Sequence, residues 1–249
     1  MTRWQTPAIV LGSEPRGESD RRVHLLTPEA GRVWALAKGA LRSRKRFAGL
    51  FDLMQELTVG LATAPRAGGI LIEHASLIES FLPLRQNPKR LARASLLLEL
   101  AAALAPHEAP APAIYDLVRR GLHRLATDPD RDRFALVYAF RLLSASGLRP
   151  ALSACVRCSR PPAPAEALFV AAEGGVMCPE CAGAGAGFRV APATLRTLEA
   201  VIAAPESRLS RLSFTRAASH QASELLEHFI AHQLAHPSRA LAVLKTLDG

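Results

Sequence analysis

Four cysteines, arranged as two Cys-x-x-Cys pairs, constrain the fold of this chain more than any other feature of its sequence. The pairs are Cys155–Cys158 and Cys178–Cys181, and the chain has no other cysteine. Two such pairs at this separation match structural zinc sites, in which each pair closes a tight turn and four thiolates surround one ion. Such a site leaves no coordination position open for catalysis. The sequence therefore predicts one structural Zn²⁺ per chain, held by Cys155, Cys158, Cys178 and Cys181.

Disulfide bonds, a redox-active pair and free thiols are the alternatives to a zinc site. Residues 1–12 lack the apolar core and the cleavage site of a secretory signal, and cytoplasmic proteins seldom keep structural disulfides. A redox-active pair would not need a second copy, so zinc is the favoured interpretation. Ser159 and Ala182 follow the pairs where glycine would adopt a positive φ at lower cost. Gly174 and Gly175 are expected to form the turn of a small hairpin that leads to the second pair.

The net charge indicates a polyanionic partner. The 249 residues include 31 Lys and Arg against 22 Asp and Glu, a formal net charge of +9. A chain this basic is expected to bind a polyanion such as a nucleic acid. No run of residues reaches the roughly 18 uninterrupted apolar residues of a membrane span. We therefore expect a cytoplasmic protein that does not enter a membrane.

The first third of the chain has the pattern of a small β-barrel. Short apolar runs with alternating polarity are separated by turn residues and show no helical period. Five strands within residues 1–80 fit an OB-type barrel. The predicted strands are Ala8–Leu11, Arg22–Leu26, Arg32–Ala37, Leu57–Leu61 and Gly69–Ile72.

Basic residues concentrate in two segments of this predicted barrel. No acidic residue lies between Glu29 and Asp52, a stretch that includes the loop after the third strand. An ordinary solvated loop would account for this charge, but a cationic groove beside stacking aromatic rings is typical of barrels that bind single strands. We therefore predict that the loop and a second group near the first two strands bind DNA. The loop residues are Lys38, Arg42, Arg44, Lys45 and Arg46, and the second group is Arg16, Arg21 and Arg22.

Two aromatic residues near these groups are candidates for stacking on bases. Phe47 ends the basic loop, and Trp34 lies in the third predicted strand. The place of Trp34 in an apolar strand favours a core position over a stacking one.

The remainder of the chain is predicted to be helical. Apolar residues recur at helical spacing in segments that end at proline or glycine. The fold class is therefore α+β: a barrel domain over residues 1–80, then a helical domain over residues 81–249 with an inserted four-cysteine zinc knob at residues 150–187. The predicted helices are Lys89–Ala105, Ile114–Thr127, Asp130–Ser146, Pro192–Ala203, Arg216–Ala235 and Ser238–Leu247.

Histidines recur every four residues along one of these helices. Glu224, His228, His232 and His236 share one helical face. Two histidines at this spacing can chelate a metal, but His-Glu-x-x-His is absent and the opposite face is apolar. A solvated polar stripe is the favoured interpretation.

Short motifs along the whole chain resemble, in the same order, those of the RecO family of bacterial DNA repair proteins. Each motif alone is weak, but together they are specific. Ser159 departs from the glycine that usually follows the family's first cysteine pair. The motifs are Ala8–Leu11, Gly17–Glu18, Arg21–Arg22, Thr27–Gly31, Ala37–Ala40, Arg46–Leu50, Ser144–Leu152 before the first pair and Gly174–Met177 before the second.

This resemblance implies a recombination mediator. Such a protein would bind single- and double-stranded DNA, anneal complementary strands, and act with RecR on strands coated by single-stranded DNA-binding protein (SSB) to load RecA. It would be cytoplasmic and associated with the nucleoid. In the family, the helical domain is thought to receive the acidic, hydrophobic C-terminal tail of SSB, and arginines suit its carboxylates. The candidates for that contact are Arg119, Arg120 and Arg124.

Two other classes of protein remain open. A zinc-containing RNA- or ribosome-binding protein with an OB fold would share the barrel, the cysteine pairs and the charge, and preference for structured RNA would identify it. A DNA-processing enzyme with an unrecognised site is the second. However, the sequence has no Walker loop, no Gly-x-Ser-x-Gly and no paired acidic cluster for two-metal chemistry. We therefore expect a protein without enzymatic activity.

Overall fold

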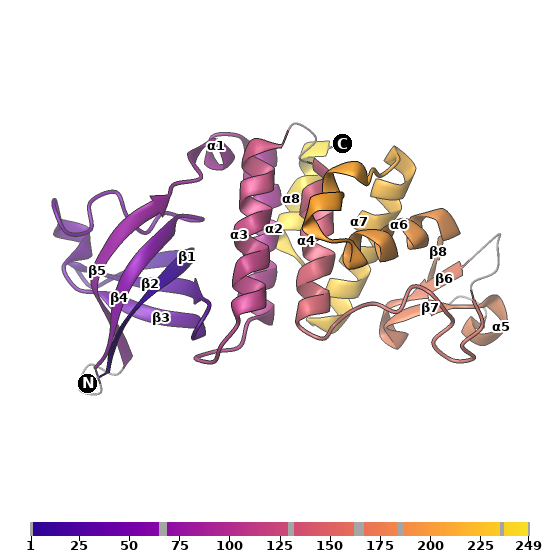
Figure 1. Cartoon of the computed structure of the whole chain (residues 1–249), viewed down its shortest axis with the longest axis horizontal. Coiled ribbons are helices and arrows are strands. Elements are labelled where there is room, and N and C mark those ends of the chain that lie inside the picture. Colours follow the sequence, from indigo (N-terminus) through magenta and orange to yellow (C-terminus); the bar gives the residue numbers. More distant parts are fainter. Residues whose placement is uncertain are drawn as a thin grey trace. The chain divides into compact units, whose positions relative to one another are not determined.

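The protein comprises two compact units in a computed structural model that describes residues 2–64, 69–128, 132–161, 167–183, 187–234 and 237–248. The units are Met1–Asp128 and Pro129–Gly249 (Figure 1). The first holds a β-barrel and three helices, and the second holds the remaining helices and the small sheet beside the cysteines. The knob predicted at residues 150–187 includes residues 162–166 and 184–186, which lie outside the described residues.

Five strands close into a barrel in the order β1-β2-β3-β5-β4, as expected of an OB-type fold. All five predicted strands are confirmed, although β1 and β5 extend well beyond the predicted runs. β1 pairs with both β2 and β4, and a bulge between Val10 and Gly12 lets it turn from one neighbour to the other. The strands are β1 Arg3–Arg16, β2 Asp20–Thr27, β3 Gly31–Ala37, β4 Glu56–Ala64 and β5 Gly69–Glu79.

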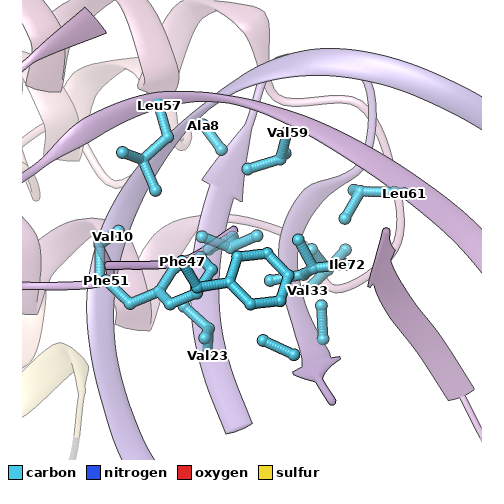
Figure 2. Close-up of a cluster of buried hydrophobic side chains, with 13 residues drawn as sticks. Ala8, Val10, Val23, Val33, Phe47, Phe51, Leu57, Val59, Leu61 and Ile72 are labelled. Atoms are coloured by element: carbon cyan, nitrogen blue, oxygen red, sulfur yellow. The ribbon is translucent and has the colours of Figure 1, made fainter. Parts of the chain in front are cut away.

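Alternate residues of the strands point inward and fill the barrel. In β3, Val33 and Ala35 are buried, as the two-residue period of a strand requires. Phe47 and Phe51, from the segment between β3 and β4, enter the same core, with ring centroids 5.3 Å apart (Figure 2). Only 3% of Phe47 is exposed, so the expectation that it stacks on bases is wrong. Its ring completes the apolar interior, which excludes water at that end of the barrel.

Two long helices belong to the same compact unit as the barrel. They follow the short α1 (Leu82–Arg85) and are α2 (Pro88–Leu104) and α3 (Pro112–Thr127). The turn between β2 and β3 docks into the connection between them, since Arg32 N donates to Pro106 O at 2.9 Å. At Gly31 a Cβ would lie 2.3 Å from Pro106 O, so only glycine fits. The unit thus extends beyond residues 1–80, and the predicted domain boundary remains a prediction.

The second unit is a helical bundle with a three-stranded sheet. All the predicted helices are confirmed, with ends shifted by a few residues. His236, the last member of the histidine stripe, lies outside the described residues. No helix in the described ranges is long and apolar enough to cross a membrane. The helical elements are α4 Asp132–Ala145, α6 Pro192–Ala203, η4 Glu206–Arg211, α7 Arg216–Gln233 and α8 Arg239–Asp248.

The small sheet has the order β7-β6-β8. Its strands are β6 (Ala167–Val170), β7 (Gly175–Met177) and β8 (Phe188–Val190). The predicted hairpin is confirmed: β6 and β7 are antiparallel, and Gly174 at their turn has a φ of 76°. Phe169 of β6 is fully buried and packs on Phe229 of α7, with ring centroids 6.0 Å apart. This contact anchors the sheet to the helices of the same unit.

Candidate metal centre and candidate nucleic-acid interface

Backbone hydrogen bonds to β7 bring the two cysteine pairs together. Ala151 N donates to Gly174 O at 3.0 Å, and Val176 N donates to Ala151 O at 2.8 Å. Val156 N, inside the first pair, donates to Val176 O at 3.0 Å. A Cβ at Gly175 would lie 2.4 Å from Ala151 O, so this close approach requires glycine. Because the second pair follows β7 directly, the first pair is held beside it.

The four sulfur atoms have the spacing of a tetrahedral metal site. All lie within 4.8 Å of one another, and Sγ of Cys158 is 3.7 Å from Sγ of Cys178. Four sulfurs at about 2.3 Å from one ion would be separated by about 3.8 Å. A disulfide needs about 2.05 Å, and all four cysteines are free. The cluster, half of it buried, therefore fits a four-coordinate ion such as Zn²⁺ without an open position.

The turns after the pairs differ from each other. Ser159 has a φ of 59°, which confirms the expected left-handed residue after the first pair, and Ser159 N donates to Cys155 O at 2.9 Å. The second expectation is wrong, because Ala182 ends the short helix α5 (Pro179–Ala182) and has no positive φ. The positive φ there belongs to Gly183, at 72°, a backbone conformation that glycine adopts without strain.

The environment of the thiols favours a cation among them. Burial raises the pKa of Cys155, but backbone N–H groups of Cys178, Cys158 and Arg157 outweigh it and bring that pKa to about 6. A hydrogen bond from Arg160 lowers the pKa of Cys158. Hydrogen bonds shared with Cys178 and Cys158 raise the pKa of Cys181 to about 12. Neighbouring thiolates thus resist joint ionisation, and a divalent cation would remove that conflict.

The two basic segments, distant in sequence, meet at one end of the barrel. The loop after β3 opens with the 3-10 turn η1 (Ala40–Arg42). Leu41 N donates to Ser19 O at 2.9 Å, and Gly39 N donates to Oδ1 of Asp20 at 2.8 Å. The backbone N–H of Gly39 is the main reason that the pKa of Asp20 lies below its usual value, and the hydrogen bond from Ser19 is the second. The loop is therefore tied to the β1–β2 turn, beside the second basic group.

Some of the eight predicted DNA-binding residues already form ion pairs or hydrogen bonds within the protein, and others do not. Arg22 pairs with Glu14 at 3.4 Å, and Arg42 pairs with Glu18 at 3.1 Å. Arg21 donates to Ser13, and Arg46 donates to Lys38 O and lies over the Phe47 ring. Four exposed side chains have no hydrogen bond or ion pair within the described part of the chain: Arg16, Lys38, Arg44 and Lys45.

Trp34 lies on the outer face of the barrel, so its predicted core position is wrong. Its neighbours Val33 and Ala35 point inward, which turns Trp34 outward by the alternation of the strand. Its half-buried ring stacks on His24, with centroids 4.4 Å apart and planes at 7°. The Arg22 guanidinium lies 4.3 Å from the ring centroid. The ring therefore lies beside a residue of the basic group.

The three arginines proposed for the SSB tail each bond a carboxylate, which lies in α3, directly after it or in the barrel. Arg120 contacts Asp116 at 3.9 Å, and Arg124 contacts Asp128 at 3.5 Å. Arg119 Nε donates to Oε1 of Glu56 at 3.0 Å. They do not form one row of unpaired charge.

Glu56 is a buried carboxylate whose role sequence reasoning missed. Its side chain is 4% exposed, and Oε1 also accepts a 2.9 Å hydrogen bond from Tyr115. Burial, followed by the negative charge of Glu56, raises the pKa of Tyr115. The Tyr115 hydroxyl therefore stays protonated and can donate its hydrogen bond to Glu56. Oε2 has no partner among the described residues. The only sequence signal is an acidic residue that opens an apolar strand.

Comparisons with known proteins agree with this architecture. Family models described as "Recombination protein O N terminal" and "Recombination protein O C terminal" match residues 1–81 and 85–242. The chain is 33% identical over 251 residues to the DNA repair protein RecO of Anaeromyxobacter dehalogenans strain 2CP-C, covering 100% of this chain and 97% of the relative. It is 33% identical over 258 residues to that of Symbiobacterium thermophilum, covering 100% and 98%.

Proposed function

Because this chain belongs to the RecO family of DNA repair and recombination proteins, we propose that it is a DNA-binding recombination mediator. It binds single- and double-stranded DNA and anneals complementary strands. It acts with RecR on SSB-coated strands to load RecA, in the cytoplasm and in association with the nucleoid.

The observation that carries the proposal is the meeting of two basic segments at one end of a closed barrel. The hydrogen bonds from Leu41 N to Ser19 O and from Gly39 N to the Asp20 carboxylate hold them together, so their charge acts on one stretch of phosphates. Lys38, Arg44 and Lys45 are exposed and unpaired within the described residues, so phosphate contact would break no ion pair of theirs. Neutralised phosphates release counterions, which supplies the affinity.

Trp34 supplies the aromatic surface that such a site needs. Single-strand binding barrels pair a cationic groove with rings on which bases stack, each stack worth about 1–3 kcal/mol. The outer face of strands two and three is the usual binding face of OB folds. Trp34 lies on β3 of that face, where its ring already contacts His24 and the Arg22 guanidinium, so a base would stack on the ring by replacing one of these two neighbours.

Annealing on this surface requires no catalytic residue. Two strands repel through their phosphates, and a protein of net charge +9 lowers that repulsion by replacing condensed counterions. Bases held by stacking keep their pairing edges available. We therefore propose a mediator without enzymatic activity.

The metal and partner sites follow the same proposal. Cys155, Cys158, Cys178 and Cys181 hold one structural Zn²⁺, which ties the segment before β6 to the end of β7. The SSB tail binds the helical part of the chain. If Arg120 and Arg124 receive it, its carboxylates exchange with Asp116 and Asp128, which now bond these arginines.

A matched pair of variants tests the interface. Arg44→Ala/Lys45→Ala removes two unpaired charges from the loop, and Arg196→Ala/Arg208→Ala removes two exposed charges from the second unit. Affinity for a labelled single-stranded oligonucleotide is measured across a salt series. The loop variant should bind more weakly with a slope shallower by about 0.7 per lost phosphate contact. Equal effects of both variants would refute the loop as the site, and preference for structured RNA would support the RNA-binding class.

A further inference from the structure

Arg160 reaches from one cysteine pair to the other. Its Nε donates to Sγ of Cys158 at 3.4 Å, and Nη2 lies 3.9 Å from Sγ of Cys178. Nη2 also donates to Glu180, which stands between the two cysteines of the second pair. One guanidinium therefore contacts a sulfur of each pair and a carboxylate that fixes its position.

The backbone of the first turn directs Arg160 to this position. Cys155 N donates to Arg160 O at 2.8 Å, and the left-handed Ser159 reverses the chain between them. The guanidinium that follows the first pair is thereby held beside its sulfurs. The turn thus sets the backbone of Arg160, and Glu180 of the second pair fixes its guanidinium.

The chemistry of a four-thiolate site gives this contact a role. Four thiolates and one divalent cation carry a net charge of about −2, concentrated on the sulfurs. Charge-assisted hydrogen bonds offset that charge, and outer partners of metal ligands commonly change metal affinity by about 10- to 100-fold.

We propose that Arg160 is a positioning residue of the metal centre, which links the two cysteine pairs and stabilises their sulfurs in the metal-bound arrangement. It slows the loss of Zn²⁺ from the four sulfurs. This inference rests on the proposed zinc site and goes beyond the proposed DNA binding.

Arg157 is a matched control. The side chains of Arg157 and Arg160 are both 57% exposed, and each pairs with a glutamate. The Arg157 side chain bonds Glu173 at 2.7 Å, whereas the guanidinium hydrogen bonds to sulfur among the described residues come from Arg160. Arg157→Gln thus removes the same charge from the same knob without removing a side-chain hydrogen bond to a ligand.

The experiment compares wild type, Arg160→Gln, Arg160→Lys and Arg157→Gln in the full-length protein. Zinc content is measured first, then the rate of Zn²⁺ transfer to a chromophoric chelator, and finally the sulfur-to-metal charge-transfer band after Co²⁺ substitution. Arg160→Gln should release Zn²⁺ about tenfold faster and shift the band. Arg160→Lys keeps the charge but lacks the several planar N–H donors of a guanidinium, so its release rate should be intermediate. Arg157→Gln should match wild type.

Two results would overturn the proposal in distinguishable ways. Wild type without stoichiometric zinc would overturn the metal site and Arg160's role together. Wild type with zinc, but with Arg160→Gln and Arg157→Gln equal in release rate and band position, would overturn the role of Arg160 alone. Neither result bears on DNA binding, which the loop variants test separately.

Discussion

Removal of Arg119 should destabilise the first unit more than removal of its partner Glu56. Arg119 is 45% exposed and Glu56 4% exposed. In Arg119→Ala the carboxylate stays buried with only the Tyr115 hydroxyl, and an uncompensated buried charge costs about 3–5 kcal/mol. For Arg119→Ala we expect the unfolding free energy to fall by about 2–4 kcal/mol, less than the full cost, because the half-exposed Arg119 leaves the carboxylate partly open to water. In Glu56→Gln the guanidinium can be hydrated, and one lost hydrogen bond costs about 1 kcal/mol.

The assay is urea unfolding followed by tryptophan fluorescence. Both tryptophans, Trp4 and Trp34, belong to the first unit, so the signal reports on that unit. Arg120→Ala is the control, because its pair with Asp116 is exposed on both sides and should contribute less than about 1 kcal/mol.

The double variant completes the test. When Glu56→Gln accompanies Arg119→Ala, no buried charge remains, so the loss should be smaller than for Arg119→Ala alone. If Glu56→Gln proved as damaging as Arg119→Ala, or if the two effects simply added, the carboxylate would not depend on Arg119 for its burial.

Three further predictions concern single side chains. Cys155→Ser should lose the metal and lower the melting temperature, while Phe169 keeps the sheet on α7; unchanged zinc content and melting temperature would contradict this. Phe47→Ala should lower the unfolding free energy by about 3–5 kcal/mol in urea, because it empties the barrel core. Burial, followed by the charge of Arg32, lowers the pKa of His24 from 6.5 to about 4. Between these two pH values the unfolded chain therefore binds a proton at His24 that the folded chain does not bind. Stability should therefore fall as pH drops from about 6.5 toward 4, and His24→Gln should make the melting temperature less dependent on pH in that range.

Local patterns were sufficient to predict the elements and the cysteine cluster. Alternating polarity predicted the strands, and helical spacing with proline or glycine at the ends predicted the helices. The spacing of the two cysteine pairs predicted that the four cysteines lie together. All three predictions depend on residues close in sequence, and all three were confirmed. The positive φ of Ser159 was also predictable from a tight turn after the first pair, but the same reasoning failed at Ala182, where α5 continues and the positive φ falls on Gly183. The ends of elements were less predictable: β5 continues to Glu79 through polar residues that pair with β4.

Contacts between distant segments could not be predicted in this way. Phe47 enters the barrel core only because the segment between β3 and β4 folds back against the strands. Trp34 is different, because strand alternation alone places it on the face of Arg32 and Leu36, away from Val33 and Ala35. The sequence likewise does not indicate that Leu41 bonds Ser19 and so joins the two basic groups. Glu56 was missed because its partners lie on a helix more than fifty residues away.

Annealing of DNA through the joined basic segments is the activity that we propose for this protein. The decisive experiment measures the annealing rate of complementary oligonucleotides, bare and SSB-coated, with wild type, Arg44→Ala/Lys45→Ala and Arg196→Ala/Arg208→Ala. We predict that wild type accelerates both reactions, that the loop variant is slower with a weaker salt dependence, and that the control matches wild type. No acceleration of either substrate by wild type would contradict the proposed activity.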